Sequence, residues 1–247
     1  MKRVQKTAAL LLTLALAGFT FFADGCKKSS STVEPTTIPI TTDIFPLTVG
    51  HKIIYTGYLR SIGTDTNITS TGTTYSSSWT VVSNDTATPL GGTSNLIVDS
   101  ITAPTPTATP LYVQRDPPTG EANFSFLQSI TFQGTDTLTW ILVGDIGDGV
   151  AAYWPAFVDS AITGDSTVVL KVAGQFADQE SLTVGGQSFN TYRLELTENI
   201  IVDGVVRDVN IPLATYWFAS GIGPVKMIVD ATEQKNGYEW DFKSKNF

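Results

Sequence analysis

The chain has 247 residues, of which 42% are hydrophobic and only 15% are charged, and its formal net charge is −8. This length suffices for one large β domain or two small ones, and an acidic chain without a basic cluster is a poor partner for nucleic acid or anionic lipid. One cysteine and one histidine exclude an internal disulfide and leave few of the side chains that build zinc sites and Ser-His-Asp triads. We therefore expect a protein with no cofactor, no nucleic-acid partner and no enzymatic activity.

The amino-terminal segment has the order of an export signal. Three cationic residues, Lys2, Arg3 and Lys6, precede an uncharged apolar run over residues 8–23, which small residues and Cys26 then follow. A run of this length is shorter than the ~20 residues that a membrane-spanning helix needs, so an uncleaved anchor is the weaker alternative. We expect residues 1–25 to be a signal peptide, whose removal takes away a net charge of +2 and leaves −10.

The end of this segment, Ala23-Asp24-Gly25-Cys26, resembles the lipobox of bacterial lipoproteins, although Asp24 departs from the small uncharged residue usual at its position. The resemblance implies that Cys26 carries diacylglycerol and a further acyl chain such as palmitate. It also implies lipid anchoring at the bacterial outer membrane, facing the periplasm or the cell surface. The alternative is cleavage by the ordinary signal peptidase, whose small-x-small rule Ala23 and Gly25 also satisfy, giving a secreted protein with a free thiol.

A polar tether separates this signal from the folded part. Residues 26–44 are rich in Ser, Thr and Pro and show no apolar periodicity. Such a segment cannot bury enough apolar surface to fold alone. We expect a tether over residues 26–44 and a single β domain over residues 45–247.

Short runs of β-branched and aromatic residues, separated by turn residues, continue to the carboxyl end. The strongest strand candidates are 53–59, 79–82, 96–98, 111–113, 124–126, 138–143, 168–172, 192–197 and 238–242. Asp203-Gly204 and Gly185-Gly186 each predict a tight hairpin, and residues 96–100 and 111–113 are expected to pair across a Pro/Thr-rich loop. The pattern predicts an all-β fold with very little helix: an antiparallel sandwich, a barrel or a curved half-barrel sheet.

A helix is compatible with the sequence only over residues 151–161, where Pro155 limits it to a turn or two. The same segment holds the aromatic residues Tyr153, Trp154 and Phe157 beside a Gly-rich turn. Aromatic side chains on a loop can stack on sugars or contact lipid tails. These three residues are therefore the candidate ligand-binding residues, and the alternative is that they plug one end of the core.

Two further segments carry a family resemblance. Residues 45–55 resemble an FPLxxGxxWxY opening, and residues 216–226 resemble a YxFAxGVGxVK segment, both found in uncharacterised bacterial lipoproteins. The resemblance implies no activity that can be transferred. In physical terms, Tyr216–Ala219 and Val225–Val229 are expected to be two strands joined at Gly221 and Gly223, with aromatic residues that fill the core.

Acidic residues supply the remaining candidates for chemistry. Asp145 and Asp148 lie in a Gly-rich turn and are weak candidates for a calcium site, although the spacing is not that of an EF-hand and an ordinary turn is the simpler interpretation. A glycosidase needs two carboxylates facing each other across a cleft, and Glu195 with Glu198 or Asp159 with Asp165 would be the candidate pairs. Alternation places Glu195 opposite the apolar Leu194 and Leu196, which predicts a solvent-facing side chain.

Three functions remain at this stage. The first is a non-catalytic, membrane-anchored extracytoplasmic lipoprotein that binds or scaffolds a partner such as a glycan, a lipid or a protein. The second is a carrier of apolar ligands, such as lipids, in a β cavity, which requires a hollow interior. The third is a carbohydrate-binding or carbohydrate-processing surface protein.

Overall fold

The computed structural model describes residues 40, 43–62, 68–70, 72–102, 106–115, 123–132, 134–146, 149–231 and 237–247. All of them belong to the compact unit Thr37–Phe247, which is distinct from a unit over Met1–Thr36. The predicted signal peptide, Cys26 and most of the predicted tether therefore lie outside the described residues. Within the described ranges no helix has the length and apolar character needed to cross a bilayer.

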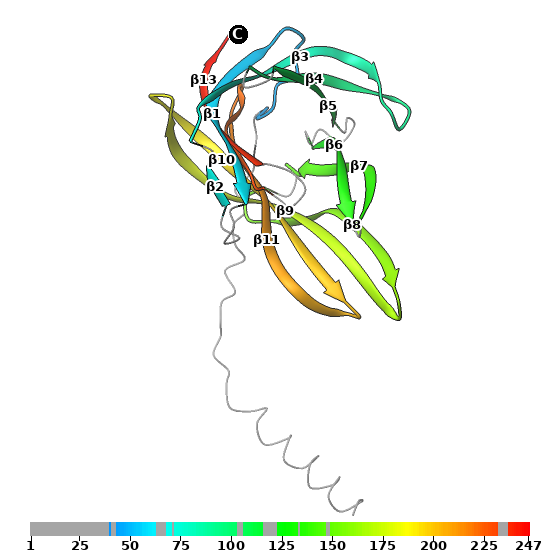
Figure 1. Cartoon of the computed structure of the whole chain (residues 1–247). Helices are drawn as coiled ribbons and strands as arrows, with labels where there is room; N and C mark the ends of the chain where they lie inside the picture. Colours follow the sequence, from blue (N-terminus) through cyan, green and yellow to red (C-terminus); the bar gives the residue numbers. More distant parts are fainter. Residues whose placement is uncertain are drawn as a thin grey trace, which may run out of the picture. The chain divides into compact units, whose positions relative to one another are not determined.

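The described chain is all β, which confirms the predicted fold class. Its strands are β1 (Lys52–Ile62), β2 (Ile68–Ser70), β3 (Tyr75–Ala87), β4 (Thr93–Ile101), β5 (Thr107–Arg115), β6 (Phe124–Phe132), β7 (Thr135–Gly144), β8 (Tyr153–Thr163), β9 (Ser166–Val184), β10 (Gln187–Val202), β11 (Val205–Ala219), β12 (Gly223–Val229) and β13 (Gly237–Lys245). They form one antiparallel sheet in the order β7-β6-β5-β4-β3-β1-β13-β12-β11-β10-β9-β8, with β2 paired to β1. The sheet curls into a nearly closed barrel (Figure 1).

Turn chemistry explains why neighbouring strands along the chain are neighbours in the sheet. Asp203 (φ 51°) and Gly204 (φ 78°) form the β10–β11 turn, and Gly185 (φ 58°) and Gly186 (φ 76°) form the β9–β10 turn. Paired positive φ angles match the right-handed twist of the flanking strands. Both hairpins are confirmed, as is the pairing of β4 with β5 across the Pro/Thr-rich loop.

The segment expected to hold a helical turn is instead strand β8. Its alternating burial, with Trp154 and Ala156 buried and Tyr153 and Pro155 exposed, is the period of a strand and not of a helix. Pro155 lies at an irregularity in the pairing with β9. A proline is tolerated there because β8 is an edge strand, where a missing backbone N–H costs no ladder hydrogen bond.

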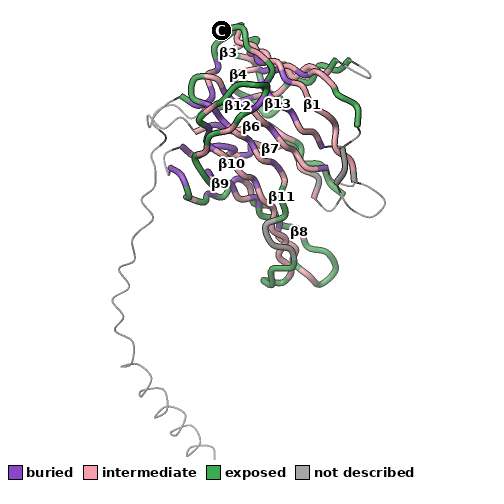
Figure 2. Tube along the Cα trace, turned by 90° about the vertical axis from the view of Figure 1, so that its left-hand side faces the viewer, coloured by how far each residue is buried: buried purple, intermediate pink, exposed green. Residues whose placement is uncertain are grey.

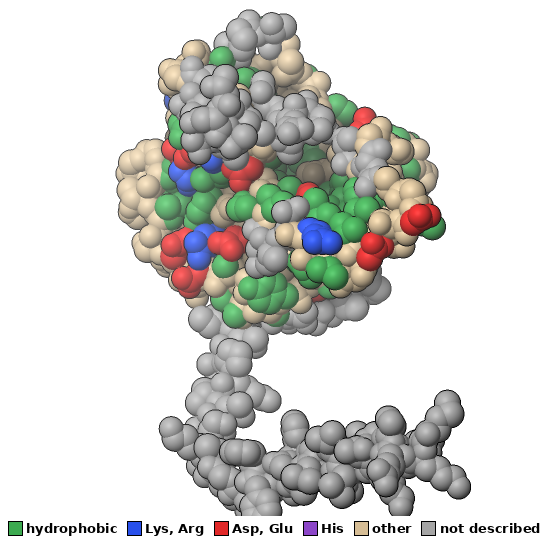
Figure 3. All heavy atoms as spheres, turned by 60° about the horizontal axis from the view of Figure 1, so that its bottom comes forward, with side chains coloured by type: hydrophobic (Ala, Val, Ile, Leu, Met, Phe, Trp, Pro, Cys, Tyr) green, Lys and Arg blue, Asp and Glu red, His purple; other side chains and the backbone are tan. Residues whose placement is uncertain are grey.

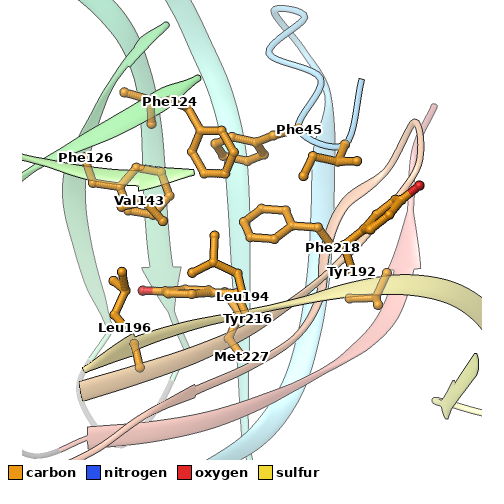
Figure 4. Close-up of a cluster of buried hydrophobic side chains, with 14 of the residues drawn as sticks. Phe45, Phe124, Phe126, Val143, Tyr192, Leu194, Leu196, Tyr216, Phe218 and Met227 are labelled. Carbon is orange, nitrogen blue, oxygen red and sulfur yellow. The ribbon is translucent and has the colours of Figure 1, made fainter. Parts of the chain in front are cut away.

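An aromatic cluster fills one end of the barrel. The ring of Phe45 lies 5.2 Å from that of Phe124, 5.7 Å from Phe218, 5.9 Å from Phe126 and 6.3 Å from Trp79, all between centroids. Figure 4 shows Phe45 meeting rings that come from widely separated strands. Tilted and edge-on aromatic pairs at these distances stabilise a core beyond the area that they bury.

Phe45 belongs to a segment that precedes β1 and closes this end. Ile40, Ile44 and Leu47 are also buried, so the folded body includes Ile40 and Ile44, which the sequence analysis had placed in the tether. Asp43 holds the segment in place: its carboxylate pairs with Arg115 (Nη2 to Oδ1, 2.6 Å), and its carbonyl accepts the Gly221 N–H at 2.8 Å. We call residues 43–47 the plug, and the end that they close the plugged end.

A side-chain hydrogen bond joins the two edge strands of the sheet, β7 and β8. The Trp154 indole Nε1–H donates to the Leu142 carbonyl at 2.9 Å. The Trp154 ring lies over Gly174, where a Cβ would stand 2.3 Å from the ring. This contact is a latch between the edges, because backbone pairing does not join them.

Candidate functional site

The interior is packed at the plugged end. Side chains that point inward by register include Tyr55 on β1, Trp79 on β3, Ile97 on β4, Met227 on β12 and Trp240 on β13, and all five are buried. On β3, buried and partly buried positions alternate from Ser77 to Val81, and Figure 2 marks the buried and partly buried stretches of the other strands. This half of the molecule is therefore a conventional solid core.

The next inward layer, toward the other end, is only partly buried. On the same strands the inward positions Leu59, Tyr75, Ile101, Val229 and Tyr238 are apolar or aromatic, pack against the core and keep part of their surface exposed. In Figure 3 hydrophobic side chains gather around a hollow on this face of the molecule. We call this half the open half. Apolar surface left exposed on the inside of a sheet is characteristic of a ligand-binding interior.

A carboxylate lies where the packed half gives way to the open half. Asp99 stands on β4 between Ile97 and Ile101, in phase with both, and it pairs in register with the inward Trp79. Ser77, on the neighbouring strand and itself buried, donates from Oγ to Asp99 Oδ1 at 3.0 Å. An acid thus lies among the mostly apolar and aromatic side chains of the interior.

Burial raises the pKa of Asp99, and hydrogen bonding from Ser77 and Trp79 opposes that rise without cancelling it. Removal from water disfavours the charged form of an acid more than these donors favour it. The negative charge of Asp99 is felt in turn by interior phenols. Burial first, and the Asp99 charge in addition, raise the pKa values of Tyr55, Tyr216 and Tyr238.

Further polar groups surround the same space. The Tyr55 hydroxyl donates to the Pro224 carbonyl at 3.0 Å, and a side-chain hydrogen bond joins Tyr216 and Tyr238. The buried indole N–H group of Trp240 has no hydrogen-bond partner within the described part of the chain. A few convergent polar groups in an apolar surround are the usual composition of a small-molecule site.

The open half reaches solvent beside Asp99. Strand β5 pairs with β6 only from Val113 to Arg115, and its first four residues, Thr107–Pro110, are exposed. Thr109, the exposed register partner of Asp99, lies in that stretch. The part of β5 that pairs with Asp99 is therefore not paired with β6.

The three aromatic residues proposed as a ligand site are divided between the two faces of β8. Trp154 is buried and forms the latch, and Phe157 is partly buried against the core. Tyr153 is 70% exposed on the outer face. The period of two explains the division, since residues 153 and 154 of a strand must point to opposite sides.

Tyr153 borders a pocket of about 270 Å³ on the outer face. Its other lining residues come from β9, β10 and β11: Ala173, Gly174, Gln175, Glu195, Leu196, Thr197, Pro212 and Thr215. Glu195 is solvent-facing and pairs with Arg193 at 3.4 Å. The pocket combines an exposed aromatic ring with amide, hydroxyl and carboxylate groups.

The pair Glu195 and Glu198 considered for chemistry is divided between the two faces of β10. Glu195 and Glu198 lie three positions apart on a strand whose pairing with β9 is continuous there, so they belong to opposite faces. Asp148 lies outside the described residues. Among the described residues, Asp145 included, no group of three or more His, Cys, Asp and Glu side chains could hold a metal ion. The sole histidine, His51, precedes β1 and stacks on Phe247 with ring centroids 3.9 Å apart.

The sequence analysis did not single out Asp99 and Ser77, although a signal was present. In Leu96-Ile97-Val98-Asp99-Ser100-Ile101 the acid alternates in phase with two isoleucines. Because residues two positions apart on a strand share a face, Asp99 is predicted to point inward if Ile97 and Ile101 do. The same run can also be interpreted as a continuous apolar segment followed by a polar turn. Under that interpretation nothing indicates that Asp99 shares a face with the two isoleucines.

No protein-family model and no curated protein matches this chain. Two solved structures are similar to it. One, from Parabacteroides distasonis and described as a candidate lipoprotein, has a TM-score of 0.40 and 13% identity over 83% of this chain and 99% of its own. The other, from Bacteroides fragilis and described as a candidate exported protein with a YmcC-like fold, has a TM-score of 0.35 and 12% identity over 82% of this chain and 98% of its own.

Proposed function

We propose that this chain is a lipid-anchored, extracytoplasmic, non-catalytic protein that binds an apolar ligand in the open half of its barrel-like sheet. The observation that supports it is the layer of inward apolar side chains, among them Leu59, Ile101 and Val229, that remains partly exposed. The lipobox-like segment at Cys26 supports the anchor and the location.

The energetic argument follows from that layer. Each square ångström of apolar surface removed from water stabilises a complex by about 25 cal/mol, so a chain-like apolar molecule in the open half would gain by covering these side chains. The packed half cannot take a ligand without displacing Phe45 and the rings around it. The ligand is therefore assigned to the open half alone.

The test is binding of a neutral fluorescent apolar probe, N-phenyl-1-naphthylamine, to the full chain carrying Cys26→Ala, which lacks acyl chains. Ile101→Trp fills the open half and should weaken binding by about tenfold or more, since it occupies the volume that the probe needs. Ser100→Trp, one position along β4 and on the outer face, is the matched control and should leave binding unchanged. Equal binding by both variants would refute the interior site.

The outer pocket supports a second candidate function, carbohydrate binding. The exposed ring of Tyr153 offers a face on which a sugar can stack, and Gln175, Glu195 and Thr197 offer hydrogen-bonding groups around it. Tyr153→Ala should abolish binding of any oligosaccharide that the wild-type chain retains on a glycan array. Retention of no glycan by the wild type would remove this candidate.

A further inference from the structure

We infer that Asp99 selects the ligand of the open half, and that this ligand is an amphiphile whose apolar chain ends in a positively charged hydrogen-bond donor, such as a primary ammonium group. The inference rests on the proposed function, because it requires the open half to be the binding site. It adds the chemistry of the polar end.

The first argument is the placement of the carboxylate. Asp99 lies at the inner limit of the open half, directly beside the buried Trp79 and Ser77. An apolar chain lying along Leu59, Ile101 and Tyr238 would bring one of its ends to this depth. Asp99 is the one carboxylate among the inward residues named above that a polar group at that end would meet.

The second argument is the unused hydrogen-bonding capacity of Asp99. An ionised carboxylate accepts up to about four hydrogen bonds. Within the described part of the chain, the Ser77 hydroxyl donates to it at 3.0 Å and the Trp79 indole is the second side-chain donor that acts on it, so about two of these positions remain. The remaining capacity fits an ammonium group, which has three N–H donors and no acceptor.

The third argument is charge. The ion pairs formed among the described residues all involve other carboxylates. They are Arg60 with Asp230, Arg115 with Asp43, Arg193 with Glu180 and Glu195, and Lys226 with Glu239 and Asp241. Asp99 belongs to none of these pairs. A largely buried charge without a counter-ion is unfavourable, and a cationic ligand would supply the missing charge at that point. A neutral or anionic end group would supply no positive charge to Asp99.

The experiment compares three ligands with the same ten-carbon chain: decylamine, 1-decanol and decanoate. Each is titrated calorimetrically, below its aggregation limit, into the full chain carrying Cys26→Ala. We expect decylamine to bind about tenfold more tightly than 1-decanol, the contribution of one charge-assisted hydrogen bond, and decanoate to bind most weakly. Asp99→Asn should reduce the amine-to-alcohol ratio to about one and leave 1-decanol binding unchanged.

Asp85→Asn is the matched control, because it removes the same charge from an exposed position on β3 and should keep the wild-type ratio. If circular dichroism shows that Asp99→Asn is not folded, Asp99→Ser replaces it in the same comparison. A wild-type ratio near one, or a ratio that survives the loss of Asp99, would overturn the role of Asp99 while the apolar site stands. Failure of the wild type to bind any of the three ligands would overturn the proposed function as well.

Discussion

Single residues of this protein show how one position in a strand decides between solvent and interior. Asp99 faces inward because it is in phase with Ile97 and Ile101, whereas Glu195 faces outward because it is out of phase with Leu194 and Leu196. The two acids differ in environment for that reason alone. Burial raises the pKa of Asp99, and an acid whose ionisation is disfavoured by folding lowers stability wherever it is ionised.

Replacing Asp99 with Asn should therefore stabilise the unliganded chain at pH 7. We expect a rise in unfolding temperature of about 2–4 °C, which corresponds to about 1 kcal/mol in a chain of this length. Ser77 can still donate to the amide oxygen of Asn, so the hydrogen bond is kept.

The sign of the pH dependence follows from the raised pKa. The wild-type penalty is present above the folded-state pKa of Asp99, shrinks as the pH falls through that value, and is absent below the ordinary pKa of an aspartate, so the two unfolding temperatures should converge in acid. Scanning calorimetry from pH 3 to pH 7, with Asp85→Asn as the control, measures this. Equal unfolding temperatures at pH 7, or a difference that grows in acid, would contradict the argument.

At the scale of elements, the two edge strands decide how far the sheet closes. β7 and β8 are the ends of the strand order, and unpaired sheet edges favour association with other chains. Here the Trp154 latch joins them, and Gly174 leaves space for the indole ring, since a Cβ there would overlap it. Because Gly174 on β9 has no side chain, the Trp154 ring on β8 can lie over it and reach the Leu142 carbonyl on β7.

Trp154→Phe should loosen this junction. It keeps an aromatic ring over Gly174 but leaves the Leu142 carbonyl without the indole donor, which should cost about 1 kcal/mol of stability. Hydrogen exchange should accelerate in β8 and in the adjoining part of β7.

The matched control is Trp217→Phe, which removes a comparable donor, the Nε1–H that reaches Glu180 Oε1 at 2.7 Å on the outer face. That variant should not change exchange in β7 or β8. Identical exchange profiles for the two variants would show that the latch does not hold the edges together.

At the scale of the whole molecule, the proposed location depends on the amino-terminal segment and the proposed binding depends on the barrel-like body. A lipidated Cys26 would hold the body at the membrane through acyl chains, each buried CH₂ contributing ~0.8 kcal/mol. The apolar interior is separate in sequence from that anchor, since the plug begins at residue 43.

Cys26→Ala should release the protein from the membrane fraction, because it removes the only thiol that can be acylated. Fractionation with metabolic palmitate labelling measures both properties together. Ser29→Ala, in the same polar segment, should stay membrane-bound and labelled. A Cys26→Ala protein that fractionates like the wild type would contradict the anchor.

The amino-acid sequence by itself determined the strands, the hairpins and the fold class. Period-two patterns and Asp-Gly or Gly-Gly turns act over a few residues and need no distant partner, so runs such as 192–197 and the Asp203-Gly204 turn were predictable. It was also enough to indicate that Tyr216 and Phe218 fill a core, because strands that alternate aromatic residues bury them.

Only the tertiary structure decided which side of each strand is the interior and where that interior stays open. Alternation tells which residues share a face, but not that Asp99 of β4 lies close enough to Tyr216 of β11 to raise its pKa, since the two strands are far apart in the sequence. The strand nature of residues 153–163 depends on pairing with β9, the next strand along the chain, and this pairing overrides the local preference that suggested a helical turn. The hollow depends on the curvature of the whole sheet and on how far the plug reaches into it, and both are set by contacts between segments, not by any one of them.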